Sequence, residues 1–181
     1  MSNPKIQLEL LHGTNEENEE WIMQGRVDCS FIRIPTCKQL KATFLKRDPL
    51  VAVLPEKHIL AKEVCFPISA LSEYPYIKLN EGVDDEISEI FEIHQITPTV
   101  HFTEKDDYAI IAMVESELGI SVLPKLVLEN TSRKIICKEL EIPAYRDLGI
   151  AIKDKSLISS STEKFLSYVQ LWVSEEYDLS L

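Results

Sequence analysis

The residue types that most often carry chemistry are present in this chain, but their spacing matches no known catalytic or metal-binding motif. The histidines are His12, His58, His94 and His101, and the cysteines are Cys29, Cys37, Cys65 and Cys137. No two cysteines form a Cys-x-x-Cys pair, and no histidine completes a zinc pattern with them. The phosphate-loop, dinucleotide-binding, zinc-protease and serine-hydrolase motifs are also missing. We therefore predict no catalytic residues, no metal site, no cofactor and no enzymatic activity.

Three short polar stretches have the composition of ligand-binding loops. They are Gly13-Thr14-Asn15, Asn80-Glu81-Gly82 and Lys105-Asp106-Asp107, and each one leads into an expected helix. In α/β folds, ligands gather where strands end and such loops meet, and free backbone N–H groups at a helix N-terminus bind anions. Taken singly, each stretch is more simply explained as a helix cap. The sequence leaves both interpretations open.

The elements that must position these loops alternate between strand and helix. Strands are expected at 6–11, 28–33, 50–54, 76–79, 100–102, 120–124 and 148–152. Helical periodicity of apolar residues fills the intervals between several of these strands. The alternation predicts an α/β fold with largely parallel sheets.

Capping signals set the expected helices. The first helix begins after Thr14, which forms a capping box with Glu17, and it ends at Gly25. A second helix is expected to begin at Asp84 or Asp85. A third is expected to begin at Asp106 or Asp107, to turn Leu118 inward and to end at Gly119. The last is expected to begin at Ser160 and to bury Phe165, Val169 and Trp172.

The overall charge argues against one large class of partners. The chain has 181 residues with 19 basic and 30 acidic side chains, which gives a formal net charge of −11. A duplex-binding surface needs clustered Lys and Arg to neutralise phosphates, so this segment is a poor candidate for gripping nucleic acid. The start has no basic stretch followed by an apolar run, and no apolar run reaches the roughly 18 residues of a membrane span. We expect a cytoplasmic protein that does not bind membranes.

Three segments resemble, in sequence and in order, the LysR-type transcriptional regulators. They are PKIQLELLHGTNEENEEWIMQGRVDCSFIR, LKRDPLVAVLPEKHILA and MVESELGISVLPKLV, and together they cover nearly the whole chain. The resemblance is to the C-terminal effector-binding domain, and it implies an α/β fold with two lobes, like the type 2 periplasmic binding proteins. One lobe would be residues 1–46 plus 148–181, and the other would be residues 47–147.

The chain departs from the family pattern in several places. Ile59 stands where a proline is usual after His58, Glu117 stands where a small residue or glycine often precedes the Leu-Gly, and Asn18 occupies a position that is more often apolar. The helix-turn-helix domain and the first strand–helix unit of the effector domain are both missing from this sequence. We therefore expect a fragment of a longer regulator, in which the 6–11 strand lacks a neighbour and seeks a partner.

The resemblance also implies an effector site. By position, Thr14 and Asn15 match the turn after the family's second strand, and Arg33 and Ile34 match the loop after its third strand. Asn80 and Gly82 would face them from the other lobe. Arg33 would pair with both oxygens of a carboxylate effector, because a guanidinium offers two parallel N–H donors. The alternative is a surface arginine in an ordinary ion pair.

The function implied by the resemblance is the sensing of a small metabolite, expected to be an organic anion, in the cleft between the lobes. Closure would alter how subunits of a homo-oligomer pack, and DNA would be bound only through a helix-turn-helix domain absent from this chain. One alternative is a free-standing solute-binding protein of a transporter, which would need a leader or lipid anchor. Another is an enzyme on the same scaffold, which would need a catalytic pair across the cleft.

Overall fold

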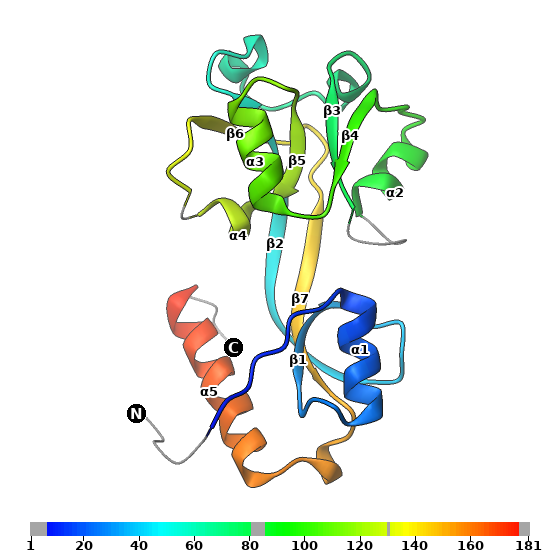
Figure 1. Ribbon diagram of the computed structural model, residues 1–181, viewed down its shortest axis with the longest axis vertical. Coiled ribbons are helices and arrows are strands. Elements are labelled where there is room, and N and C mark those ends of the chain that lie inside the picture. The colour runs from blue at the N-terminus through cyan, green and yellow to red at the C-terminus, as the bar shows by residue number, and fades with distance from the viewer. Residues whose placement is uncertain (1–6, 81–85, 130, 178–181) are drawn as a thin grey trace. The chain divides into compact units, whose positions relative to one another are not determined.

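The chain folds into two compact units in the computed structural model, which describes residues 7–80, 86–129 and 131–177 (Figure 1). Unit 1 comprises Met1–Arg47 and Asp147–Leu181, and unit 2 comprises Asp48–Arg146. Two strands contribute to both units: β2 (Lys41–Pro55) and β7 (Tyr145–Ile152). The chain therefore passes from one unit to the other between residues 47 and 48 and again between residues 146 and 147. The sequence predicted these boundaries between residues 46 and 47 and between residues 147 and 148.

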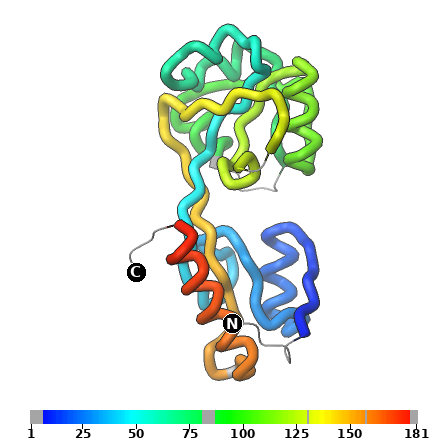
Figure 2. Tube along the Cα trace, turned by 90° about the vertical axis from the view of Figure 1, so that its left-hand side faces the viewer, coloured from blue at the N-terminus to red at the C-terminus, as the bar shows by residue number. Residues whose placement is uncertain are grey.

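Unit 1 consists of a small sheet with a helix on each side. Strand β1 (Ser30–Ile34) pairs antiparallel with β7, with Ser30 opposite Ala151, and β7 lies next to β2. Helices α1 (Asn15–Gln24) and α5 (Ser160–Glu176) flank these strands (Figure 2). A short 3-10 turn, η3 (Lys155–Leu157), precedes α5. Each helix has its own apolar contact: Ile22 of α1 packs with Ile32 and Ala151, and Leu45 and Ile150 pack with Val169 and Val173 of α5.

The predicted first helix is confirmed at both of its ends. The Thr14 side chain accepts a hydrogen bond from the Glu17 N–H at 3.2 Å, and the Glu17 carboxylate accepts one from the Thr14 N–H at 2.8 Å. This is the reciprocal arrangement that the Thr-x-x-Glu spacing predicts. Gly25 ends the helix with φ +70°, a left-handed conformation that glycine adopts without steric cost.

Unit 2 combines antiparallel strand pairs around β2 with a separate parallel pair of strands. The second half of β2 pairs antiparallel with β5 (Ser121–Pro124) and with β6 (Ile135–Glu139). Strand β3 (Tyr76–Leu79) pairs parallel with β4 (Val100–Glu104), and Tyr76 forms a parallel bridge with Ile120 just before β5. The helices are α2 (Glu86–Ile93), α3 (Asp107–Glu115) and α4 (Lys125–Leu128), with 3-10 turns η1 (Ile59–Lys62) and η2 (Ile68–Ser72).

The alternation of side chains along β2 divides the interior of unit 2 into two apolar clusters. Leu50, Ala52 and Leu54 belong to one cluster, whereas Val51 and Val53 belong to the other. Successive side chains of a strand point to opposite faces of its sheet, so both faces of this strand are covered. That explains why its last six residues are all buried.

Two expectations about strands are wrong. The described part of the 6–11 segment forms no strand, and Leu8 and Leu10 are 62% and 87% exposed. A strand exists only where a neighbour accepts its backbone hydrogen bonds, and β1 pairs with β7 instead. The sheets are also not largely parallel, because β7 returns beside β1 in the opposite direction and β2 enters unit 2 against β5 and β6.

Two expectations about helix faces are also wrong. Trp172 is 47% exposed, because α5 is covered on one face only and Val169 and Val173, four residues apart, occupy that face. Helix α3 ends at Glu115, before the predicted Gly119, and Leu118 is 47% exposed. Gly119 is needed for a close approach instead, since an added Cβ would lie 2.5 Å from the Pro75 carbonyl oxygen. None of the helices among the described residues combines the length and the apolar character that crossing a membrane requires.

Candidate functional site

One group of predicted site residues meets at the start of α1 and the end of β1, within unit 1. The Asn15 side-chain oxygen accepts a hydrogen bond from the Arg33 backbone N–H at 2.8 Å. This bond joins the backbone at Arg33 to Asn15. It also brings together Thr14, which precedes Asn15, and Ile34, which follows Arg33. Asn15 therefore positions the backbone that carries the Arg33 side chain.

A buried carboxylate continues this hydrogen-bond group. Glu19, which is 1% exposed, accepts hydrogen bonds from the backbone N–H groups of Cys37 and Lys38 at 3.1 and 3.0 Å. It also accepts a long bond of 3.4 Å from the Asn15 side-chain amide. Buried carboxylates are stable when backbone donors satisfy them, so Glu19 ties the loop after β1 to α1. Sequence reasoning did not single out Glu19.

These contacts make the start of α1 less suited to anion binding than the sequence predicted. The capping box engages the backbone N–H and the side-chain oxygen of Thr14, and the first turn of α1 also holds the acidic Glu16 and Glu17. Negative charges there compete with an incoming anion for the positive end of the helix dipole. Arg33 is the one cation in the predicted residue set, so recognition of an anion by this set depends on Arg33.

The predicted residues of unit 2 are only partly described. The Asn80 backbone N–H donates to the Glu104 carbonyl oxygen at 2.7 Å, which joins the ends of β3 and β4. Gly82 lies outside the described residues. The third polar loop contains a helix cap, since the Asp106 carboxylate accepts from the N–H groups of Tyr108 and Ala109 at 2.8 and 3.4 Å.

A charged group that sequence reasoning missed lies at the same end of unit 2. Asp48, which is 1% exposed, accepts from the Arg146 guanidinium at 3.0 Å and from the Leu126 backbone N–H at 2.9 Å. Nearby, one carboxylate oxygen of Asp107 is buried without a hydrogen-bond partner among the described residues. Burial raises the pKa of Asp107, while the charge of Arg146 acts to lower it and that of Asp106 to raise it. The available signal was a pair of Arg-Asp dipeptides, at 47–48 and 146–147, beside apolar strands.

Several kinds of chemistry find no support among the described residues. No cluster of His, Cys, Asp and Glu in the described part of the chain could hold a metal ion. The four cysteines are all free thiols, and burial raises the pKa of Cys29 and Cys137. These two are therefore protonated at neutral pH and weak nucleophiles.

Comparison with protein families gives one match that covers almost the whole chain. Residues 2–173 match the LysR substrate binding domain. Among curated proteins, the uncharacterized transcriptional regulator YvbU of Bacillus subtilis is 26% identical over 167 residues, which are 90% of this chain and 56% of that protein. The probable transcriptional regulator LrrA of Synechococcus elongatus is 25% identical over 92% of this chain and 57% of its own length. The chain thus spans little more than half the length of these relatives.

Solved structures show the same fold. The CcmR regulatory domain of Synechocystis, in complex with 2-PG, has a TM-score of 0.84 at 22% identity and covers 94% of this chain and 85% of its own. The effector binding domain of QuiR, in complex with shikimate, has a TM-score of 0.77 at 19% identity, and the match covers 90% of this chain and 79% of the QuiR chain. At these identities the likeness establishes the architecture of the chain.

Proposed function

Since this chain belongs to the LysR substrate-binding domain family, we propose that it is the effector-sensing part of a transcriptional regulator. The effector is a small organic anion, and binding it changes the state of a larger DNA-bound oligomer. The matched relatives are transcriptional regulators, of which the matched segments make up 56% and 57%, and this supports the regulator over the transporter alternative. In this proposal, another part of the full-length protein binds DNA. The full-length protein acts in the cytoplasm and catalyses no reaction.

The observation that carries the choice of an anion is the fixed position of Arg33. Its backbone is held by Asn15 at 2.8 Å, and the loop that follows is held by the buried Glu19. A guanidinium on a fixed backbone loses less conformational freedom when it pairs with a carboxylate, which favours binding. Ligands of this kind occur in the similar structures, where QuiR holds shikimate, a carboxylate. The roles of Thr14, Ile34, Asn80 and Gly82 in binding, and the cleft between the units, stay predictions.

A substitution of Arg33 tests this function. Shikimate, 2-PG and a panel of small mono- and dicarboxylates are first screened by thermal shift, because a ligand of the folded state raises its melting temperature. For each ligand found, calorimetry then compares the wild type with Arg33→Ala. We expect the affinity to fall about tenfold or more, as the loss of a hydrogen bond to a charged group predicts.

The matched control is Arg133→Ala, which removes an arginine of unit 2 from its ion pair with Glu115. This variant should bind the carboxylate like the wild type. Equal affinities of Arg33→Ala and the wild type would contradict the role of Arg33. A panel in which no organic anion binds would contradict the proposed effector class.

A further inference from the structure

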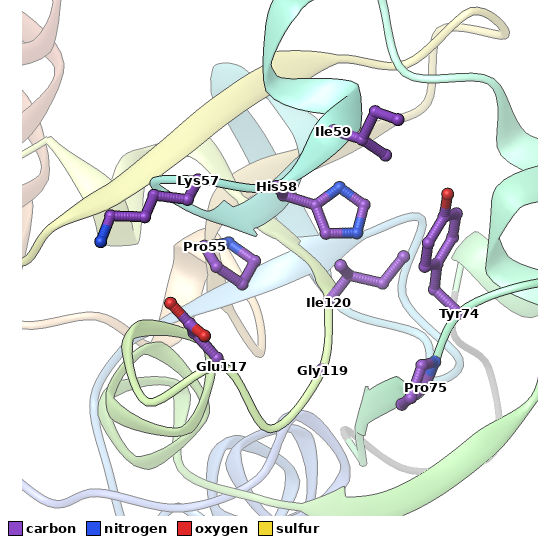
Figure 3. Close-up of a pocket in the computed structure, with 9 residues that line it drawn as sticks. All are labelled: Pro55, Lys57, His58, Ile59, Tyr74, Pro75, Glu117, Gly119 and Ile120. Carbon is purple, nitrogen blue, oxygen red and sulfur yellow. The ribbon is translucent and has the colours of Figure 1, made fainter.

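Unit 2 contains a cavity that none of the predicted effector residues lines. Its volume is about 420 Å³, which is within the range of small-molecule sites. The lining residues come from the end of β2, from the turn before β3 and from the segment before β5 (Figure 3): Pro55, Lys57, His58, Ile59, Tyr74, Pro75, Glu117, Gly119 and Ile120.

The cavity and Asn80, the predicted effector residue of this unit that the structure describes, lie at opposite ends of strand β3. It is formed where β3 and β5 begin, whereas Asn80 follows the end of β3. Along β2, Pro55 is roughly 23 Å from Asp48 at the usual strand rise. Within unit 2, a ligand in this cavity is therefore at the other end of β3 from Asn80.

One side of the cavity is aromatic and apolar. The rings of His58 and Tyr74 meet edge to face, with their centroids 4.6 Å apart. The Leu60 backbone N–H donates to His58 Nδ1 at 3.3 Å, so the proton of the neutral ring is on Nε2. Burial lowers the pKa of His58, which keeps the imidazole neutral at pH 7. Together with Ile120 below them, these rings offer a surface for an apolar or aromatic group (Figure 3).

The other side carries one charge of each sign. Lys57 and Glu117 lie on either side of Pro55, with Tyr74 on the opposite side of the cavity, and the Lys57 side chain extends away from the His58 ring (Figure 3). Neither side chain forms an ion pair within the described part of the chain. Both charges are thus available to a ligand that enters beside Pro55.

Glu117 occupies a backbone position that favours glycine. Its φ is +60°, in the left-handed region that residues with a Cβ rarely adopt. This conformation ends helix α3, because the Glu117 N–H donates to the Val114 carbonyl oxygen at 2.9 Å and the Leu118 N–H donates to the Met113 carbonyl oxygen at 3.1 Å. Glu117 also lines the cavity, so a glycine at this position would remove the charge and relieve the positive φ together.

We propose that this cavity is a second ligand site, which binds a free α-amino acid with an apolar or aromatic side chain. Lys57 pairs with the carboxylate of the amino acid, Glu117 pairs with its ammonium group, and the side chain packs against His58, Tyr74 and Ile120. One charge of each sign and an apolar wall in the same cavity match the three parts of such a molecule. None of these residues belongs to the proposed anion site at Arg33.

Calorimetry with the full chain tests the ligand class. The probes are phenylalanine and leucine, together with 3-phenylpropanoate, which lacks the ammonium group, and phenethylamine, which lacks the carboxylate. We expect phenylalanine to bind about tenfold more tightly than either analogue, because each analogue leaves one charge of the cavity without a partner. Equal binding of an analogue, or no binding of either amino acid up to roughly 10 mM, would overturn the proposal.

Two variants test the residues. Lys57→Gln should weaken phenylalanine binding without altering phenethylamine binding. Glu117→Gly should weaken phenylalanine binding while its melting temperature stays at or above that of the wild type, because glycine relieves the positive φ. This second variant separates loss of binding from loss of folding.

The matched controls are Lys62→Gln and Glu73→Gln, which change exposed residues of η1 and of the C-cap of η2 outside the cavity. Both should bind phenylalanine like the wild type. Arg33→Ala should also leave phenylalanine binding unchanged, whereas a loss of phenylalanine binding in Arg33→Ala would place the amino acid at Arg33 and overturn the second site. The two proposals can therefore fail independently.

Discussion

Two ion pairs built from the same residue types have very different surroundings. Arg47 and Asp147 pair in unit 1, with two hydrogen bonds of 2.7 and 2.8 Å and an Arg47 side chain that is 60% exposed. Their sequence neighbours Asp48 and Arg146 pair in unit 2, at 3.0 Å, with side chains that are 1% and 13% exposed. The better hydrogen-bond geometry thus belongs to the exposed pair.

The difference shows that burial, more than geometry, determines what such a pair does for stability. Exposed pairs contribute about 0–1 kcal/mol, because water and salt already solvate and screen both charges. In a buried pair the attraction is offset by the desolvation of both ions, so its net contribution is small. Removing one partner of the buried pair is nevertheless costly, because the other charge is left without water or a counter-ion.

The largest effect is expected for Arg146→Met. This variant leaves Asp48 buried with one backbone donor, Leu126, and should lower the free energy of unfolding by about 3–5 kcal/mol. Urea denaturation at pH 7 measures the loss. The double variant Asp48→Asn with Arg146→Met should recover part of it, since no buried charge then remains. A loss below about 1 kcal/mol in Arg146→Met would show that the two pairs are equivalent.

A smaller effect is expected for Asp107→Asn, which removes a half-buried charge near the buried pair. The pKa of Asp107 is raised in the folded state, so the folded protein binds this proton more tightly than the unfolded chain does. The free energy of unfolding therefore falls as the pH rises through the interval above 3.8, the ordinary pKa of an aspartate. The variant should be more stable than the wild type at pH 7 by about 1 kcal/mol.

Urea titrations of the wild type and Asp107→Asn between pH 3 and pH 7 measure this dependence. The advantage of the variant should shrink as the pH falls, because Asp107 is then protonated in both the folded and the unfolded chain. A variant that is less stable at pH 7 would instead show that the attraction of Arg146 outweighs the cost of burial.

The smallest effect is expected for Arg47→Met. The Arg47 guanidinium lowers the pKa of Asp147, so the pair stabilises the fold above the unfolded pKa and loses this contribution as the pH falls through the folded value. We expect a loss of about 0.2–1 kcal/mol at pH 7 and low salt, which decreases in 1 M NaCl. A loss as large as that of Arg146→Met would contradict the distinction between the pairs.

The features that could be predicted from the sequence are those that depend on a few neighbouring residues. The Thr14–Glu17 capping box, the Gly25 terminator and the Asp106 cap each follow from spacings of one helical turn or less, and all three are confirmed. The family and the α/β fold class could also be predicted, because three long segments carry the resemblance in the right order.

The features that were missed depend on residues far apart in the chain. The antiparallel pairing of β1 with β7 joins Ser30 to Ala151, and no local pattern reports the direction of such a partner. The buried pair joins Asp48 to Arg146 in the same way. Trp172 was assigned to the core by hydrophobicity, but only the position of α5 on its sheet decides which face is covered.

The candidate site was predictable in part. Thr14, Asn15, Arg33 and Ile34 do come together, although the structure shows that Thr14 caps a helix and that Asn15 holds the backbone at Arg33. Their part in binding stays a prediction. The cavity around His58 could not be foreseen, since its lining comes from three separate segments and its strained member, Glu117, was visible in sequence only as a departure from the family pattern.

The pairing of β1 with β7 has a consequence for the order of events during synthesis. Unit 2 is one continuous stretch of chain, whereas unit 1 is made from two stretches that flank it. Ribosomes add about 5–20 residues per second, so β1 emerges on the order of ten seconds before the strand that completes its sheet. Unit 2 can therefore fold on the ribosome before β7 is available to the early residues of unit 1. During this time Phe31 and the leucines before α1 are accessible to chaperones.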